Sequence, residues 1–121
     1  MTQPRVLLVD DNALILEAAR RILRPSCAVV GTVMSGGKLL QAVTALQPDV
    51  VVLDLSMPGC AGLDACRQIK RARPQVKVVI LTAAVDAEIA AQATTLGASA
   101  YVLKHLMARD LAGAIQDAWI Q

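Results

Sequence analysis

Short runs of β-branched and aliphatic residues alternate along the chain with longer segments whose apolar positions recur at helical spacing. The pattern predicts five strands, at Arg5–Val9, Ala28–Val33, Val50–Leu53, Val76–Leu81 and Ala100–Leu103. It predicts five helices, at Ala13–Leu23, Gly37–Leu46, Leu63–Ala72, Ala87–Leu96 and Met107–Ile120. Most of the strands are continuous apolar runs, which is typical of a parallel sheet covered by helices on both faces. We therefore predict an α/β fold, a doubly wound (βα)5 sandwich with right-handed crossovers.

Length and composition limit the classes of protein to consider. The chain has 121 residues, which suits one domain over 1–121, and 55% of them are hydrophobic, which argues against disorder. One Trp, one Tyr and no Phe leave little material for stacking on bases, and a net charge of +2 indicates neither nucleic acid nor a membrane surface as a partner. No apolar run is long enough to span a membrane, and the three cysteines do not form a disulfide or zinc pattern. We expect a cytoplasmic protein.

Polar residues follow four of the predicted strands directly. Asp10 and Asp11 follow the first strand and Asp54 follows the third, while the fourth and fifth strands lead into Thr82 and Lys104. The carboxyl ends of parallel strands share one edge of the sheet, where ligands of this fold class bind, so these side chains should converge. Three crowded carboxylates repel one another unless a cation joins them, and an all-oxygen site suits Mg²⁺.

The segments around these residues resemble the receiver domain of two-component response regulators. The resemblance rests on VLLVDD ending at Asp11, VVLDLSMPGCAG around Asp54, LTA ending at Ala83, and GASAYVLK ending at Lys104. It covers essentially the whole chain and is nearest to the branch of the family that carries helix-turn-helix output domains. It implies a flavodoxin-like sheet with strand order 2-1-3-4-5.

The resemblance also assigns roles to residues of this chain. Asp54 would accept a phosphoryl group from a phosphohistidine on a sensor histidine kinase or a histidine phosphotransfer protein. Asp11, Asp54 and the backbone carbonyl of Ser56 would hold Mg²⁺ directly, and Asp10 would act largely through a metal-bound water. Such a protein would catalyse only its own phosphorylation and dephosphorylation, and is not expected to be an enzyme in the ordinary sense.

Further family positions concern the phosphoryl group and the switch that follows its transfer. Thr82 and Lys104 would each contact a phosphoryl oxygen, while the small residues Ala83 and Gly59 would leave the in-line approach open. Tyr101 would rotate inward when Thr82 moves, and would carry the signal to the surface of the fourth helix, fifth strand and fifth helix. That surface would serve a homodimer or an output domain, with no direct contact of this domain to nucleic acid.

Two other functions remain open from the sequence. A receiver-like binding module that is not phosphorylated would be expected to lack an acidic or Lys position of the set, and none is lacking. A Mg²⁺-dependent phosphatase or phosphotransferase working through an aspartyl phosphate usually has an Asp two positions after the nucleophile, where this chain has Ser56, and a substrate-binding cap. Turnover of a small phosphomonoester would distinguish such an enzyme.

Helical spacing suggests which apolar residues are left for partners. In the first helix, Leu14, Ala18 and Ile22 recur at that spacing and are expected to face the core, which leaves Ile15 and Leu16 to dock the phosphodonor. In the last helix the expected buried stripe consists of Leu111, Ile115 and Ala118, with Trp119 or Ile120 outside it.

Three remaining features receive structural interpretations. Lys104 is followed by His105, where the family often has a cis proline, so we expect a trans peptide bond and a solvated histidine. Cys60 has no neighbouring positive charge to activate it and is expected to be inert. Basic residues at the ends of the first and third helices, among them Arg20, Arg24 and Lys70, complement the helix dipole.

Overall fold

A computed structural model describes residues 3–57, 62–84 and 86–121. The strands are β1 (Arg5–Val9), β2 (Ala28–Val33), β3 (Val50–Asp54), β4 (Lys77–Thr82) and β5 (Ala100–Leu103). The α-helices are α1 (Ala13–Leu23), α2 (Leu39–Leu46), α3 (Gly62–Ala72), α4 (Ala87–Thr95) and α5 (Met107–Trp119). Short 3₁₀ turns at Gly36–Lys38 and Lys104–Leu106 lead into α2 and α5. No helix within the described ranges is long and apolar enough to cross a membrane.

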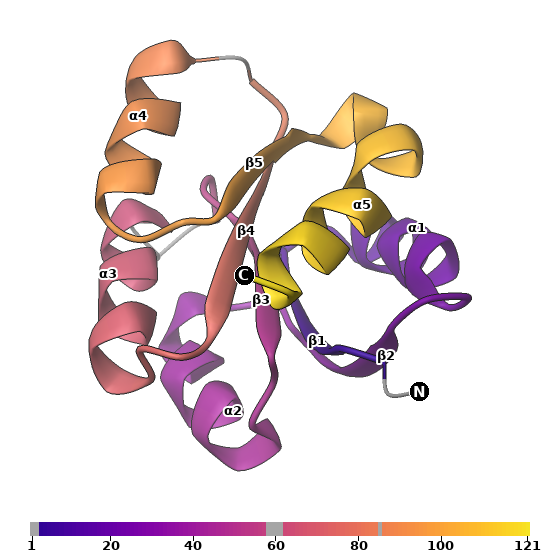
Figure 1. The fold of residues 1–121 in the computed structure, drawn as a ribbon, viewed down its shortest axis with the longest axis horizontal. Coiled ribbons are helices and arrows are strands. Elements are labelled where there is room, and N and C mark those ends of the chain that lie inside the picture. Colours follow the sequence, from indigo (N-terminus) through magenta and orange to yellow (C-terminus); the bar gives the residue numbers. More distant parts are fainter. Residues whose placement is uncertain (1–2, 58–61, 85) are drawn as a thin grey trace.

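The five strands form one parallel sheet in the order β2-β1-β3-β4-β5, which confirms the predicted fold. Helices α2, α3 and α4 cover one face of the sheet, and α1 and α5 cover the other (Figure 1). The alternation of side chains along β1 shows how both faces are filled. Val6 and Leu8 pack with α1 and α5, whereas Leu7 and Val9 pack toward α2 and α3. Burial on both faces explains why the strands are continuously apolar.

Two strands end one residue later than the sequence pattern predicted, and β4 also begins one residue later, at Lys77. Asp54 and Thr82 are the last residues of β3 and β4, because the ladders continue through the pairs Asp54–Leu81 and Thr82–Leu103. Polarity had suggested that these residues begin the loops. Their backbones are instead held in the sheet, which fixes the direction of both side chains.

The predicted orientation of α1 is wrong. Its buried residues are Leu16, Ala19 and Leu23, with Leu16 only 7% exposed, whereas Leu14 is 75% exposed. Leu16 belongs to the core between the sheet, α1 and α5. Helix α5 therefore covers the side of α1 that helical spacing had left for a docking partner. Leu16 is therefore a core residue and does not contribute to a docking surface.

The predictions for α5 and for the Lys104–His105 bond are confirmed. Leu111, Ile115 and Ala118 are buried, and Ile120, beyond the end of the helix, is 76% exposed. Trp119 is partly buried against the same core. The described part of the chain has no cis peptide bond, so Lys104–His105 is trans, and His105 is exposed in the 3₁₀ turn.

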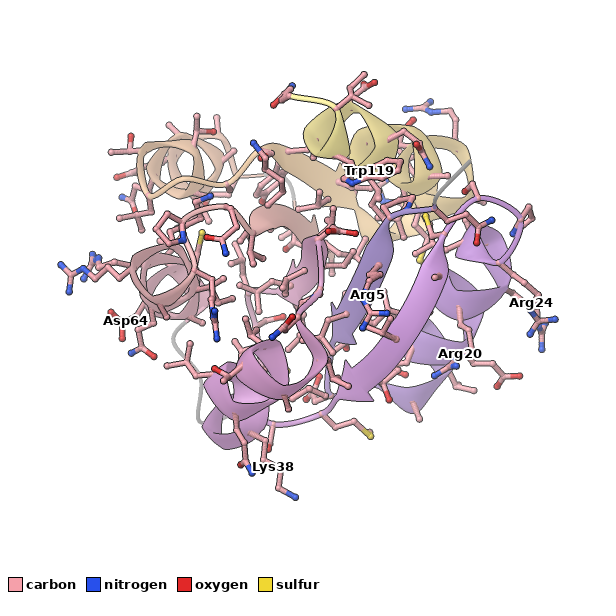
Figure 2. The ribbon with its side chains drawn as sticks, turned by 60° about the horizontal axis from the view of Figure 1, so that its bottom comes forward. Arg5, Arg20, Arg24, Lys38, Asp64 and Trp119 are labelled. Atoms are coloured by element: carbon pink, nitrogen blue, oxygen red, sulfur yellow. The ribbon has the colours of Figure 1, made fainter. Side chains whose placement is uncertain are left out.

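The basic residues that end α1 project outward from the fold, as Figure 2 shows for Arg20 and Arg24. Both are exposed at the carboxyl end of the helix, where positive charge complements the helix dipole. Lys70 of α3 differs, because its ammonium contacts backbone carbonyls of the following segment.

Candidate functional site

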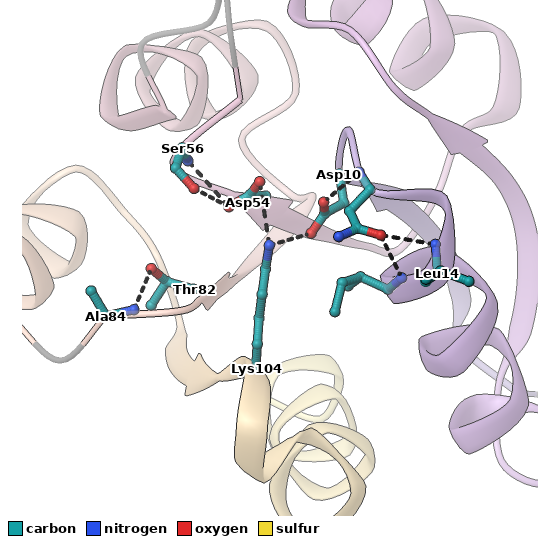
Figure 3. A network of polar contacts seen from close by, with 9 residues as sticks. Asp10, Leu14, Asp54, Ser56, Thr82, Ala84 and Lys104 are labelled. Carbon is teal, nitrogen blue, oxygen red and sulfur yellow. Dashed lines mark hydrogen bonds and ion pairs between the residues drawn. The ribbon is translucent and has the colours of Figure 1, made fainter.

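The polar residues predicted at the strand ends do lie together. Asp10 follows β1, Asp54 ends β3, Thr82 ends β4 and Lys104 follows β5, all at the carboxyl edge of the sheet (Figure 3). β1 and β3 are hydrogen-bonded neighbours, so Asp10 and Asp54 emerge side by side. The site is thus a direct consequence of strand order.

Three carboxylates form the acidic part of the site. Asp10, Asp11 and Asp54 each offer an oxygen atom, and these three atoms lie within 4.8 Å of one another. Asp10 is 2% exposed and Asp54 1% exposed, while Asp11 is open to solvent. Repulsion between carboxylates at this separation is strong where water is excluded, so the cluster needs positive charge nearby.

Lys104 supplies part of that charge. Its Nζ atom lies 2.8 Å from Asp10 Oδ2 and 3.5 Å from Asp54 Oδ2, between the two buried carboxylates. Burial acts to lower the pKa of Lys104, but contact with Asp10 and the charges of Asp10 and Asp54 outweigh it and raise the pKa above the ordinary lysine value. The ammonium is therefore charged at neutral pH and connects Asp10 to Asp54.

The two oxygens of Asp10 differ in their contacts. Oδ1 accepts a 2.9 Å hydrogen bond from the Asn12 backbone N–H, and the Asn12 side chain in turn caps α1 by accepting from the N–H groups of Leu14 and Ile15. Oδ2 is buried and has the ion pair with Lys104 but no well-angled hydrogen bond from any described residue. A buried oxygen in this state, next to two further carboxylates, is suited to a hard cation.

The two oxygens of the Asp54 carboxylate also have different contacts. Oδ1 accepts two hydrogen bonds from Ser56, at 3.1 Å from its backbone N–H and at 3.0 Å from its hydroxyl. Oδ2 faces Lys104. The role of the Ser56 hydroxyl was missed in the sequence, although an Asp followed two positions later by Ser is a common local side-chain to backbone turn.

Thr82 and Tyr101 lie at the side of the site nearest to α4. Thr82 is buried, and its hydroxyl is 3.5 Å from the backbone N–H of Ala84, a long contact. The Tyr101 hydroxyl donates a 2.9 Å hydrogen bond to the carbonyl of the same Ala84. Ala83, which lies between Thr82 and Ala84 in the chain, is exposed. The segment after β4 therefore touches both residues that were assigned to the switch.

The two residues expected to dock the phosphodonor, Ile15 and Leu16, differ in their burial. Leu16 lies in the core, and Ile15 is partly buried against it, so Leu14 is the large apolar residue of α1 that faces solvent. Its position was detectable, because Leu14 precedes Glu17 by three residues and Arg21 by seven and so shares their charged face. The expectations for Gly59 and Cys60 fall outside the described residues.

Comparison with known proteins agrees with the resemblance found in the sequence motifs. A family model described as the response regulator receiver domain matches residues 6–116. The chain is 35% identical over 116 residues to the response regulator UvrY of Escherichia coli O6:H1, covering 94% of this chain and 53% of UvrY. The chain spans about half the length of the curated relatives it matches.

Solved structures agree over nearly the whole chain. A LuxR-family two-component response regulator from Aurantimonas superposes with a TM-score of 0.91 at 32% identity, over 98% of this chain and 86% of that one. The isolated receiver domain of RcsB from Salmonella enterica, determined with a phosphomimetic, gives a TM-score of 0.88 at 28% identity, over 95% and 87% of the two chains. With the predicted sheet order and the acidic site, these matches show that the chain belongs to the response regulator receiver domains of two-component systems.

Proposed function

We propose that Asp54 is the phosphoryl acceptor of this receiver domain, and that the donor is a phosphohistidine on a sensor histidine kinase or a histidine phosphotransfer protein. The observation that carries the proposal is the asymmetric contact of its buried carboxylate. Ser56 holds Oδ1 by two hydrogen bonds, while Oδ2 faces a charged lysine. Ser56 thus fixes the orientation of the carboxylate through Oδ1, and Oδ2 is the oxygen left to attack the phosphoryl group.

The transfer needs little covalent chemistry from the protein. Asp54 Oδ2 attacks phosphorus, the bond between phosphorus and the donor imidazole nitrogen breaks, and its electron pair stays on that nitrogen. Negative charge spreads over the phosphoryl oxygens, and Lys104 and the Thr82 hydroxyl are the nearby groups of the chain that can stabilise it. The side chain of Ala83 is small and exposed, which leaves room beside the site.

Mg²⁺ fits the acidic cluster. Asp11, Asp54 and the backbone carbonyl of Ser56 would hold it directly, and Asp10 would contribute largely through water. The fit rests on the all-oxygen donor set and on the buried Asp10 Oδ2, which accepts no well-angled hydrogen bond from the residues that the structure describes. Bound Mg²⁺ would supply positive charge to the phosphoryl oxygens.

The structure favours self-catalysed phosphorylation over turnover of small phosphate esters. The position two residues after Asp54 belongs to Ser56, whose hydroxyl donates to Asp54 itself. A phosphatase acting through an aspartyl phosphate would need a carboxylic acid there to protonate a leaving group. All acidic and Lys positions of the site are filled, which also argues against a receiver-like module that is not phosphorylated.

For the phosphodonor we propose a docking surface formed by Leu14 and the exposed edge of Ile15. Both lie in the first turn of α1, whose capping residue Asn12 donates its backbone N–H to Asp10, and Leu14 is 75% exposed. The phosphorylation-sensitive surface of α4, β5 and α5 would bind a second copy or an output domain, and direct nucleic-acid contact would belong to that output domain. A cytoplasmic location is part of this proposal, since it fits the cysteine usage of the chain.

The acceptor is tested by intact mass spectrometry after incubation with acetyl phosphate and Mg²⁺. Wild type should gain one phosphoryl group that hydroxylamine removes, and Asp54→Asn should gain none. Asp64→Asn, which changes an exposed acid of α3, is the matched control and should label like wild type. Stoichiometric labelling of Asp54→Asn would show that another residue accepts the group.

Docking is tested separately by comparing Leu14→Asp with wild type for two donors. Acetyl phosphate should label both proteins at equal rates, whereas a phosphorylated histidine phosphotransfer protein should label the variant more slowly. Equal rates with both donors would remove Leu14 from the docking surface.

A further inference from the structure

Three polar residues connect β1 to α1, and their backbone is held from both sides. Asp10 and Asp11 belong to the acidic cluster, and Asn12 is the capping residue of the helix. On the strand side, the Asp10 N–H donates to the Val33 carbonyl of β2 at 3.0 Å. On the helix side, the Asn12 carbonyl accepts from the Leu16 N–H at 3.1 Å. The segment is therefore attached to the sheet at one end and to α1 at the other.

Two side-chain turns overlap within this segment. Asp10 Oδ1 accepts from the Asn12 N–H at 2.9 Å, and Asn12 Oδ1 accepts from the N–H groups of Leu14 at 2.9 Å and Ile15 at 3.3 Å. Figure 3 shows these contacts between Asp10 and the start of α1. In both turns a short polar side chain bonds to the backbone N–H two positions ahead. The second turn thus begins at the residue whose N–H closes the first.

The first turn decides where the other oxygen of Asp10 lies. With Oδ1 bonded to the N–H of residue 12, the carboxylate cannot rotate freely, and Oδ2 is directed to the Lys104 ammonium at 2.8 Å. That oxygen is buried and accepts no well-angled hydrogen bond from the residues that the structure describes. Its place next to oxygens of Asp11 and Asp54 is what suits it to a hard cation. The orientation of Asp10 therefore depends on where the N–H of residue 12 points.

The second turn fixes the direction of that N–H. Asn12 has a φ of −100° and a ψ of 110°, the extended backbone typical of a capping residue. Its bonds to Leu14 and Ile15 hold it in this conformation, because the side-chain oxygen must stay over the first turn of the helix. Loss of the cap would free the backbone of residue 12, and with it the N–H that holds Asp10.

A cap of the same geometry begins α4. Asp86 accepts from the N–H groups of Glu88 at 3.0 Å and Ile89 at 3.1 Å. Asn12 differs in being neutral, so it caps α1 without adding a fourth negative charge beside the three clustered carboxylates. Asp86 is exposed and lies outside that cluster. The two caps therefore allow a matched comparison, because only the cap of α1 bonds to a residue of the site.

We propose that Asn12 is a positioning residue of the acidic site, whose side chain holds Asp10 in the orientation that receives the cation. It acts through its own backbone N–H and the Asp10 carboxylate. The proposal deepens the function proposed above and rests on it for Mg²⁺ as the cation. The orientation of Asp10 is a property of the metal-free fold, so it can be measured without Mg²⁺.

Three variants separate the cap from the rest of the fold. Asn12→Ala removes the side-chain acceptor and keeps the backbone N–H, whereas Asn12→Ser keeps a neutral capping oxygen. Asp86→Ala, the matched control, removes the equivalent cap from α4. Asn12→Ala and Asp86→Ala should both stay folded and lose a similar amount of stability, about 5 °C in Tm. A general loss of stability then cannot explain a difference between them at the site.

The first measurement is the protection of the residue 12 amide against hydrogen exchange, read by NMR in chelator and corrected for the intrinsic rate of each sequence. Asn12→Ala should lower this protection about fivefold, the factor that corresponds to loss of one cap. Asn12→Ser and Asp86→Ala should resemble wild type. Unchanged protection in Asn12→Ala, or an equal loss in Asn12→Ser or Asp86→Ala, would overturn the proposal.

The second measurement is the affinity for Mg²⁺ alone, from amide chemical shifts during a titration with MgCl₂ at constant ionic strength. The dissociation constant should rise about fivefold in Asn12→Ala, since part of the binding free energy is then used to restore the orientation of Asp10. It should stay near the wild-type value in Asn12→Ser and Asp86→Ala. Equal affinities of Asn12→Ala and wild type, or equal losses in Asn12→Ala and Asp86→Ala, would overturn the positioning role.

A failure of the proposed Mg²⁺ site would be distinguishable from a failure of this inference. Absence of saturable shifts at residues 10–12 in wild type would contradict Mg²⁺ binding at the acidic cluster. The exchange of the residue 12 amide in chelator would still decide whether Asn12 holds Asp10.

Discussion

Replacing Asp11 with Asn should stabilise the protein in the absence of metal and reduce its stabilisation by Mg²⁺. Asp11 adds a third negative charge within 4.8 Å of oxygens of Asp10 and Asp54. Lys104 pairs with Asp10 and Asp54, and no ion pair links it to Asp11 within the described part of the chain. The substitution therefore relieves repulsion while both ion pairs of Lys104 remain.

The size of the effect follows from Coulomb's law. Two unit charges 4.8 Å apart repel by about 0.9 kcal/mol in bulk water and by about 3.5 kcal/mol at an effective dielectric constant of 20. Asp11 is exposed, so the lower figure applies to each of its two pairs, which gives about 2 kcal/mol. Longer-range attraction to Lys104 offsets roughly half of this, leaving a gain of about 1 kcal/mol, or roughly 4 °C in Tm.

Thermal and urea unfolding followed by circular dichroism provide the assay, at low salt, with chelator or with millimolar Mg²⁺. Asp11→Asn should be more stable than wild type in chelator, and salt should reduce the difference by screening. Added Mg²⁺ should stabilise wild type more than the variant, because the variant lacks one ligand. Asp64→Asn controls for loss of one exposed acid and should change stability by less than about 0.5 kcal/mol. A variant no more stable than wild type in chelator would refute the repulsion argument.

Three other predictions concern the scaffold. Leu16→Ala should lower the free energy of unfolding by about 3 kcal/mol because Leu16 is buried, whereas Leu14→Ala should change it by less than about 0.5 kcal/mol, and urea titration of both tests the corrected orientation of α1. Gly97→Ala should cost at least about 1 kcal/mol because of the positive φ and the contact with Lys70, and an unchanged urea midpoint would contradict this. Burial raises the pKa of the Cys27 and Cys66 thiols, so at mildly alkaline pH each holds less thiolate and should alkylate more slowly in the folded protein than in urea, as peptide mass spectrometry would show. Equal alkylation rates in the folded protein and in urea would contradict the effect of burial on the two thiols.

The sheet and the acidic site could be predicted from the sequence because several independent signals agreed. Apolar runs marked the strands, and each polar residue that ended a run fell at the same edge. The carboxyl ends of β3 and β4 were predicted one residue too early, because polarity ends a hydrophobic run before the hydrogen-bonded ladder ends at Asp54 and Thr82. The strand order itself came from the family resemblance, since no local pattern contains it.

The orientation of α1 and the role of Lys70 could not be obtained from helical spacing alone. Several overlapping apolar stripes run along α1, and which of them is buried depends on α5, which covers Leu16 from the side. Lys70 was interpreted as a cation complementing the helix dipole, but its acceptors are carbonyls of Pro74 and Val76 in the next loop. Both features depend on tertiary neighbours that a linear pattern does not contain.

The most direct test of the proposed acceptor is to locate the phosphoryl group on the chain. Protein labelled with acetyl phosphate and Mg²⁺ is reduced with borohydride, which converts a phosphorylated aspartate to homoserine, and the peptides are sequenced by mass spectrometry. We predict homoserine at position 54, with Asp10 and Asp11 intact, and no conversion in chelator. Conversion at Asp10 or Asp11, or full conversion of Asp54 without a divalent cation, would contradict it.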